Sequence, residues 1–362
     1  MLNLAADFIK HCTPSETTIV YHGGCGDGLA AAAILLKTFQ KLFGEIPKTK
    51  FASPGVVAKL NIHSKYIIFV DVAIDKEKEY ILGLAKNSNI LVLDHHLIVN
   101  NLNEFGIPFV HPDLFSKIPG VRYPGAKLAF DVCSILADTK DMDWIAAIGL
   151  IHDVGAEHWK PFMDKVFIKY KELGKITYTY SGKIGELVSI ITAGQELRKG
   201  NELALKVLLE ADRPSDILDA KIPEVEDLLE VNKGREEELK YYVANWEKLA
   251  DYNRKLNLVI YDVELKHKIS SALSTALSKR HPDLTFIVMN QESPSVLKLN
   301  FRQTLEKVDC NWLAKASTEP FGGNGGGHKP ASGGRIHPKY KEKFKEFVKD
   351  LLKARLNKTE QN

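Results

Sequence analysis

The chain has 362 residues, of which 44% are hydrophobic and 26% are charged, and its formal net charge is +3. This length exceeds the usual size of one domain and the apolar content suffices for packed cores, so a disordered chain is excluded and two domains are expected. A net charge this small does not by itself indicate a nucleic-acid-binding protein.

Cysteine usage and hydropathy narrow the class of protein further. The four cysteines, Cys12, Cys25, Cys133 and Cys310, have no paired spacing, which argues against a disulfide framework and against a zinc ribbon. The amino terminus has no charged region followed by a long apolar core, and no stretch approaches eighteen apolar residues. We therefore expect a soluble, cytoplasmic protein that does not associate with a membrane.

The amino-terminal part predicts alternating strands and helices. Strands are expected at residues 18–21, near Phe51, at 67–70, at 90–93 and near Phe109, and helices at 29–37, 126–137 and 144–153. Strands that are apolar on both faces are typical of a parallel sheet covered by helices. A βαβ series is therefore predicted.

Three of these strands end at potential metal ligands. The candidates are His22, Cys25 and Asp27 after the first strand, Asp71 after the second, and Asp94, His95 and His96 after the third. Because the ends of parallel strands meet at one edge of a sheet, these side chains are predicted to share a pocket. Carboxylate and imidazole groups suit manganese, zinc or iron. For the Asp94 segment taken alone, a solvated turn is the alternative.

A further acid, Asp153, follows the apolar run 144–151 and precedes Gly155, which is typical of a helix stop. Taken alone, Asp153 is a capping or surface acid. Together with the candidates at the strand ends, it is a plausible fourth side of a metal cage.

The carboxyl-terminal part predicts mostly helix, then a smaller α/β domain. Helix formers dominate residues 160–235, and residues 224–252 form one long helical run. Strands are then expected at 256–263, 284–289 and 296–301, with a helix at 269–278 between the first two. The glycine-rich segment Gly322–Gly334 is either a flexible linker or a loop whose backbone N–H groups approach phosphate oxygens. The basic run 339–358 predicts a terminal amphipathic helix, with a basic face that is solvated or contacts phosphate.

The order of these motifs resembles the DHH phosphoesterase superfamily, which includes RecJ-type single-strand exonucleases, short-oligonucleotide nucleases and some pyrophosphatases. The resemblance rests on the glycine-rich loop with His22 and Asp27, on Val70-Asp71, on Asp94-His95-His96 and on the helix-borne Asp153. Gly322–Gly334 also resembles the glycine-rich substrate loop of the DHH-associated domain, and Lys298–Arg302 the strand that carries its substrate-binding arginine.

The resemblance implies an α/β fold and three segments. Residues 1–225 would form the DHH catalytic domain, with a parallel sheet and helices on both faces. Residues 226–255 would form a linking helix. Residues 256–362 would form the smaller α/β DHH-associated domain, which binds substrate and ends in the basic helix.

The resemblance also implies a two-metal site with manganese, or with zinc, cobalt or magnesium in its place. One metal would be bound by His22, Cys25 and Asp71, and the other by Asp27, Asp71, His95 and Asp153. Asp94 would orient an imidazole, and His96 would face the scissile phosphate. The substrate-binding residues would be Arg302, Gly326, Gly327 and His328.

Cys25 departs from the pattern of the family, whose loop usually has an aspartate at this position. A thiolate is softer than a carboxylate, so the first metal position should favour zinc or iron, or bind manganese weakly. The leading hypothesis is a metal-dependent exonuclease that degrades single-stranded DNA or RNA, or short oligonucleotides. One alternative is a catalytically weak scaffold that binds single strands or that binds a partner, which is a helicase or a replication or repair protein. The other alternative is a hydrolase of small phosphoanhydrides or cyclic nucleotides.

Overall fold

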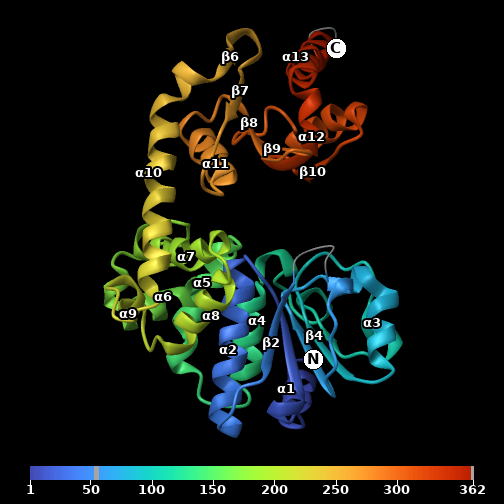
Figure 1. The fold of residues 1–362 in the computed structure, drawn as a ribbon, viewed down its shortest axis with the longest axis vertical. Coiled ribbons are helices and arrows are strands. Elements are labelled where there is room, and N and C mark those ends of the chain that lie inside the picture. The colour runs from blue at the N-terminus through green and yellow to red at the C-terminus, as the bar shows by residue number, and fades with distance from the viewer. Residues whose placement is uncertain (53–56, 360–362) are drawn as a thin grey trace. The chain divides into compact units, whose positions relative to one another are not determined.

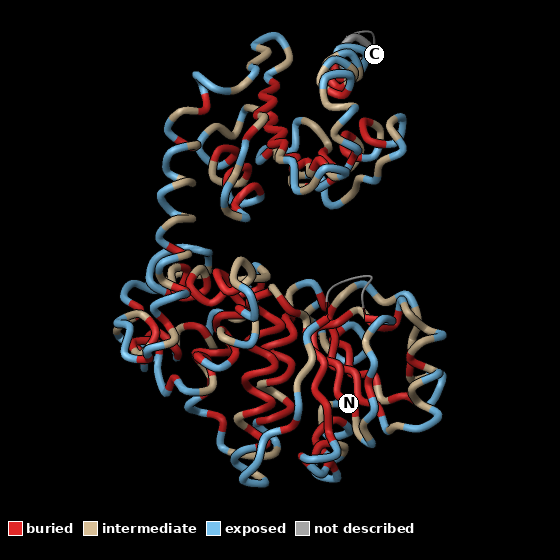
Figure 2. Tube along the Cα trace, in the orientation of Figure 1, coloured by how far each residue is buried: buried red, intermediate tan, exposed pale blue. Residues whose placement is uncertain are grey.

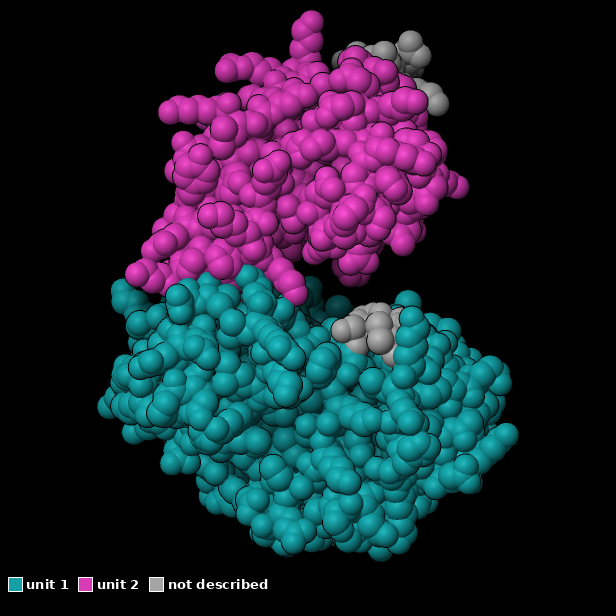
Figure 3. All heavy atoms as spheres, viewed as in Figure 1, with its two compact units in different colours: residues 1–232 teal, residues 233–362 magenta. Residues whose placement is uncertain are grey.

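The computed structural model describes residues 1–52 and 57–359, and its fold is α/β (Figure 1). The chain divides into two compact units, Met1–Asn232 (unit 1) and Lys233–Asn362 (unit 2), which Figure 3 colours separately. Helix α10 (Val225–Leu249) begins in unit 1 and continues into unit 2. The domain limits expected from the sequence stay predictions.

Unit 1 is built on a parallel sheet with strand order β2-β1-β3-β4-β5. The strands are β1 (Thr17–His22), β2 (Lys48–Ala52), β3 (Tyr66–Val70), β4 (Asn89–Leu93) and β5 (Phe109–Val110). Strand β3 therefore lies in the middle, between β1 and β4. The predicted parallel sheet is confirmed.

Successive residues of the central strands enter two different cores, because side chains alternate across a strand. On β3, Ile68 and Val70 belong to the core that includes α2 (Gly26–Phe43), whereas Ile67 and Phe69 belong to the core that includes Ile81 of α3 (Lys78–Ala85). Helices thus cover both faces of the sheet. Figure 2 shows the buried segments concentrated in these strands and in α2.

Further helices complete unit 1. They are α1 (Leu2–Lys10), α4 (Gly125–Cys133), α5 (Asp143–His152), α6 (Lys160–Lys169), α7 (Gly182–Ala193), α8 (Gly200–Glu210) and α9 (Pro214–Leu218). Residues 144–151 of α5 are all buried, which explains why this helix has no polar face in the sequence. None of the helices in residues 1–52 and 57–359 combines the length and apolar character that crossing a bilayer requires.

Unit 2 contains a mixed sheet with strand order β10-β11-β9-β8-β7-β6. Its elements are β6 (Asp251–Asn253), β7 (Leu258–Val263), α11 (Ser270–Arg280), β8 (Thr285–Ser293), β9 (Val296–Arg302), α12 (Cys310–Thr318), β10 (Asn324–His328), β11 (Ala331–Ile336) and α13 (Lys341–Thr359). One face packs on α11 and the end of α10, and the other on α12 and α13.

The glycine-rich segment is not the loop or linker that the sequence suggested. It forms the antiparallel hairpin β10–β11, which pairs through β11 with β9. Glycine is needed because α12 lies directly against this hairpin: a Cβ atom at Gly325 would lie 2.4 Å from the backbone oxygen of Ala314. The glycines therefore allow close packing between a helix and a sheet.

Candidate metal centre

The carboxyl edge of the unit 1 sheet brings the predicted ligands together. His22 is the last residue of β1, Asp71 follows β3, and Asp94 and His95 follow β4. Because these strands are parallel neighbours, their ends meet at one edge. Asp27 in the first turn of α2 and Asp153 at the end of α5 complete the group.

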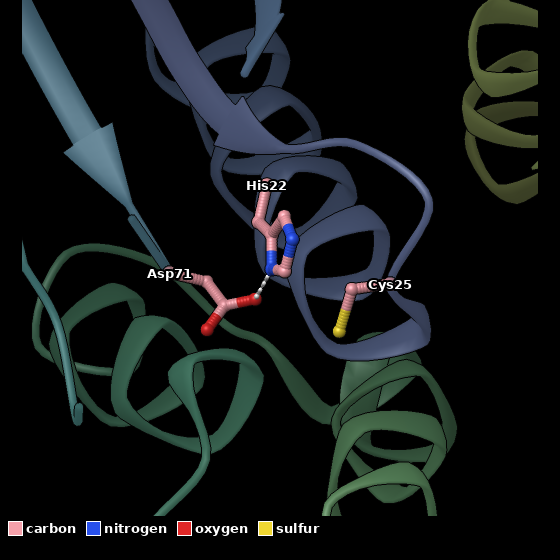
Figure 4. A group of neighbouring side chains, drawn as sticks. All are labelled: His22, Cys25 and Asp71. Carbon is pink, nitrogen blue, oxygen red and sulfur yellow. Dashed lines mark ion pairs between the residues drawn. The ribbon is translucent and has the colours of Figure 1, made fainter. Parts of the chain in front are cut away.

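Asp71 is buried, and its carboxylate lies beside the ring of His22 (Figure 4). Its Oδ1 atom lies 3.1 Å from Nε2 of His95, and its Oδ2 atom lies 3.5 Å from Nδ1 of His22. The backbone of Asp71 has a φ of 57°, a left-handed conformation that aspartate tolerates better than most residues. The two oxygens therefore face two imidazoles, as a carboxylate that bridges two metals would.

Asp27 is buried at the start of helix α4. Its carboxylate accepts hydrogen bonds from the backbone N–H groups of Gly125 at 2.6 Å and Ala126 at 2.9 Å. These bonds and the positive end of the α4 dipole stabilise a charged carboxylate. Oδ2 of Asp27 also lies 3.6 Å from Nε2 of His95.

His95 stands among three carboxylates. Besides Asp27 and Asp71, Oδ2 of Asp153 lies 3.3 Å from its Nε2 atom. Its Nδ1 atom lies 3.2 Å from the backbone oxygen of Gly120, and since a carbonyl only accepts, Nδ1 carries the hydrogen. Nε2 therefore points into the acidic group with its lone pair available to a metal, which is the usual arrangement of a metal-binding histidine.

Asp94 orients His96. Oδ1 of the buried Asp94 lies 2.8 Å from Nδ1 of His96, whose side chain is 36% exposed. The backbone oxygen of His96 accepts a hydrogen bond of 2.6 Å from Nε2 of His111, a buried histidine that the sequence analysis did not select. His96 is therefore held at both its ring and its backbone.

Burial and mutual repulsion dominate the electrostatics of the group. Burial, and then the charges of neighbouring acids, raise the pKa of Asp27 well above its usual value, and the same causes raise the pKa of Asp153. Burial also opposes the charge on Asp71, but the neighbouring imidazoles of His22 and His95 outweigh it and lower the pKa of that carboxyl. Burial would lower the pKa of His95, but Asp71 and the other acids raise it.

These observations test whether divalent cations fit the site. Two buried carboxylates, those of Asp27 and Asp71, and the partly exposed carboxylate of Asp153 surround one imidazole, and Oδ2 of Asp71 is buried without a hydrogen bond. Buried charges of one sign need a counter-charge. Three groups of donor atoms each lie within 4.8 Å of one another. The groups are Asp27 with His95 and Asp153, His22 with Cys25 and Asp71, and Asp71 with His95 and His96. The residues fit two divalent ions that share Asp71.

His152 is a potential ligand that the sequence analysis did not select. It precedes Asp153, and its ring lies with Cys25 and Asp153 in a further group of donor atoms within 4.8 Å of one another. The signal in the sequence was the adjacent pair His152-Asp153 at the end of a helix.

The predicted substrate-binding residues lie in unit 2. Arg302, Ala331 and His328 occupy one row of the sheet, on β9, β11 and β10, so Arg302 and His328 flank the same strand. The guanidinium group of Arg302 donates to Oγ1 of Thr275, Oγ of Ser271 and the backbone oxygens of Phe301 and Ser332.

The two glycines of the predicted substrate loop are part of the hairpin. The N–H group of Gly327 donates to Oδ1 of Asn311 at 3.1 Å, and its φ of 147° suits glycine. Gly326 precedes it on β10 and borders a shallow cavity that is also lined by Lys298 and Arg335.

A known domain family matches part of this chain, and several solved structures resemble its fold. Residues 255–354 match the DHHA1 domain family, and no curated protein matches the chain. The fold resembles RecJ from Thermus thermophilus in complex with Mn²⁺, with a TM-score of 0.70 and 20% identity over 98% of this chain and 55% of RecJ. It also resembles an exonuclease RecJ bound to manganese, with a TM-score of 0.68 and 20% identity over 97% of this chain and 94% of that one.

A third similar structure is a pGpG-specific phosphodiesterase from Vibrio, with a TM-score of 0.51 and 15% identity over 94% of this chain and 99% of that one. The chain spans about half the length of the Thermus RecJ. Residues 255–354 thus match the DHHA1 domain family, and the fold of the chain is that of the RecJ structures.

Proposed function

We propose that the protein is a metal-dependent phosphodiesterase, an exonuclease that degrades single-stranded DNA or RNA, or short oligonucleotides. The observation that carries the proposal is the acidic group around Asp71, where buried carboxylates and imidazoles meet at the carboxyl edge of a parallel sheet. The similarity in fold to exonuclease RecJ bound to manganese supports this choice.

The proposed metal ligands are His22, Cys25 and Asp71 for one ion, and Asp27, Asp71, His95 and Asp153 for the other. Divalent ions held there would neutralise charge on a phosphodiester and lower the pKa of a bound water. Manganese is our first choice because carboxylates provide three of the four ligands of the second ion, with magnesium, zinc and cobalt as alternatives.

The chain contributes its own groups to the reaction. Because Asp94 binds Nδ1 of His96, the other ring nitrogen of His96 is left for a substrate phosphate. Asp94 would keep this ring in one orientation, and Asp71 would keep His22 and His95 directed at the reaction centre. His96 is the most exposed of these groups, as contact with a substrate requires.

In unit 2, Arg302, Gly326, Gly327 and His328 would bind the rest of the nucleotide strand. Four of the five N–H groups of Arg302 are used within the unit, so its guanidinium group is rigidly placed. His328 is exposed at the end of β10, in the same row of the sheet.

A second candidate function is the hydrolysis of a dinucleotide or another small nucleotide. The similarity to a pGpG-specific phosphodiesterase favours it. A third candidate is a catalytically weak protein that binds single strands, or that binds a helicase or a replication or repair protein. The presence of Cys25 at a metal-ligand position favours this role.

End-labelled substrates of different length separate these functions. We would incubate the metal-free protein with a dinucleotide, a short oligonucleotide and a long single strand, each as DNA and as RNA, during a manganese titration. Cleavage of the strands from one end supports the exonuclease, and cleavage of the dinucleotide alone supports the second function. Tight binding of strands without cleavage supports the third. Asp71→Asn is the control that should not cleave.

A further inference from the structure

Asp153 faces two different imidazoles with its two oxygens. Oδ2 lies 3.3 Å from Nε2 of His95, inside the acidic group, whereas Oδ1 lies 3.9 Å from Nε2 of His152. Asp71 shows the same arrangement between His95 and His22. Asp153 therefore connects the two-metal group to a neighbouring pair of side chains, His152 and Cys25.

The backbone holds these two side chains next to each other. Cys25 precedes α2, and His152 ends α5. The His152 ring packs directly on Gly26, where an added Cβ atom would lie 3.0 Å from Nδ1 of His152. A side chain at position 26 would displace the ring, so this glycine allows the imidazole to approach the sulfur of Cys25.

The donor set differs in chemistry from the rest of the centre. Apart from the sulfur of Cys25, the two-metal group offers only carboxylates and imidazoles, and mostly carboxylates, whereas this group offers one sulfur, one imidazole nitrogen and one carboxylate oxygen, all within 4.8 Å of one another. Zinc prefers nitrogen and sulfur ligands, in tetrahedral sites with bond lengths of about 2.0–2.3 Å. Such bonds place neighbouring donors less than ~4 Å apart. The three side chains would thus have to close in only slightly to bind zinc.

We propose that Cys25, His152 and Asp153 form a zinc site beside the two-metal centre, with Asp153 as the carboxylate shared between them. Three protein ligands leave a fourth position for water, as in zinc sites that are not purely structural. The inference does not require the protein to be a nuclease, because it rests on these three side chains alone.

The proposal has a functional consequence. Zinc bound to Cys25 would take the sulfur away from the ion held by His22 and Asp71, while Asp153 would share its negative charge between zinc and the second ion. Zinc would therefore weaken manganese binding, and manganese would weaken zinc binding by the same factor, because coupling between two sites is reciprocal.

The competing assignment gives Cys25 to a metal bound by His22 and Asp71. Figure 4 shows these three side chains around one space, and their donor atoms also lie within 4.8 Å of one another. The two assignments share the sulfur and differ in the imidazole, so substitution of each histidine distinguishes them.

Cobalt(II) is a suitable probe because it replaces zinc, and a bond to a thiolate gives a charge-transfer band in the near ultraviolet. We would titrate the metal-free full chain with cobalt and measure zinc affinity by competition with a chromogenic chelator. The variants are Cys25→Ser, His152→Ala and His22→Ala, with Cys12→Ser as a matched control, since Cys12 is buried and free but lies outside these groups.

We expect the wild type to show the band and Cys25→Ser to lose it. His152→Ala should lose or strongly weaken the band and lose more zinc affinity than the roughly 10–100-fold that removal of a side chain which only orients a ligand costs, whereas His22→Ala and Cys12→Ser should keep both properties. Circular dichroism checks the folding of each variant, and His152→Asn replaces His152→Ala if the latter unfolds.

Two results would overturn the proposal. A band that persists in His152→Ala but disappears in His22→Ala would assign Cys25 to the two-metal centre. The absence of a thiolate band in the wild type would remove Cys25 from any metal site. Cleavage assays test the proposed function separately. A protein that shows the band but cleaves no strand would contradict the proposed function without contradicting the zinc site.

Discussion

Asp71 offers the sharpest test of the metal centre, because its charge and its backbone conformation can be separated by substitution. Its carboxylate faces both His22 and His95, and its φ is 57°. Asparagine adopts the left-handed conformation readily and keeps the shape of the side chain. Glycine also adopts this conformation but has no side chain. Alanine removes the carboxylate and adds strain.

All three variants should lose metal and activity. If the ions stabilise the transition state by about 4 kcal/mol in total, their loss slows cleavage by roughly 10³-fold. Stability in a chelator should differ among the variants, because alanine in the left-handed region costs about 1–2 kcal/mol relative to asparagine or glycine. For a unit of the size of Met1–Asn232, this cost lowers the melting temperature by about 2–8 °C.

The assay combines elemental analysis of the purified variants, single-turnover cleavage of a labelled strand and thermal melting in chelator. The metal content should fall equally in Asp71→Asn, Asp71→Gly and Asp71→Ala, and only Asp71→Ala should melt at a lower temperature than the other two. An Asp71→Asn variant that retained both metals, or that cleaved within about tenfold of the wild-type rate, would refute the role of Asp71 as the shared ligand.

Three further predictions concern packing, substrate and pH. Gly149→Ala should destabilise unit 1 by about 3 kcal/mol and reduce its metal content, since the new Cβ atom would lie 2.2 Å from Oδ1 of Asp27. Gly83→Ala is the control: no atom lies within 4 Å of its new Cβ atom, so it should stabilise unit 1 by about 0.5–1 kcal/mol. Equal melting temperatures of the two variants would contradict this prediction. His328→Ala should weaken strand binding in titrations but leave metal content unchanged, and loss of metal would exclude a role confined to substrate. Because the pKa of Asp27 and Asp153 is raised, the metal-free protein should lose stability as the pH rises from the ordinary carboxyl pKa of about 4 towards the raised values, so divalent ions should raise the melting temperature more at about pH 7 than at about pH 4. A smaller gain at the higher pH would contradict this reasoning.

Local sequence determined the strands of unit 1 and the residues at their ends. Runs such as Ile67–Val70 are apolar on both faces, and this pattern alone predicts a buried parallel strand. Since parallel strands end at one edge, the convergence of Asp71 with His95 follows from the pattern as well. Periodicity and composition carry this information because each acts within a few residues of the chain.

Tertiary structure decided the features that depend on contacts between distant segments. The glycine-rich segment forms the hairpin β10–β11 because it packs on α12 and pairs with β9. Neither of these contacts can be read from the residues of the segment itself. His152 reached Cys25 only because α5 ends against Gly26, 126 positions earlier in the numbering of the chain. Packing of this kind depends on the shape of both partners, so it is decided only when the whole core assembles.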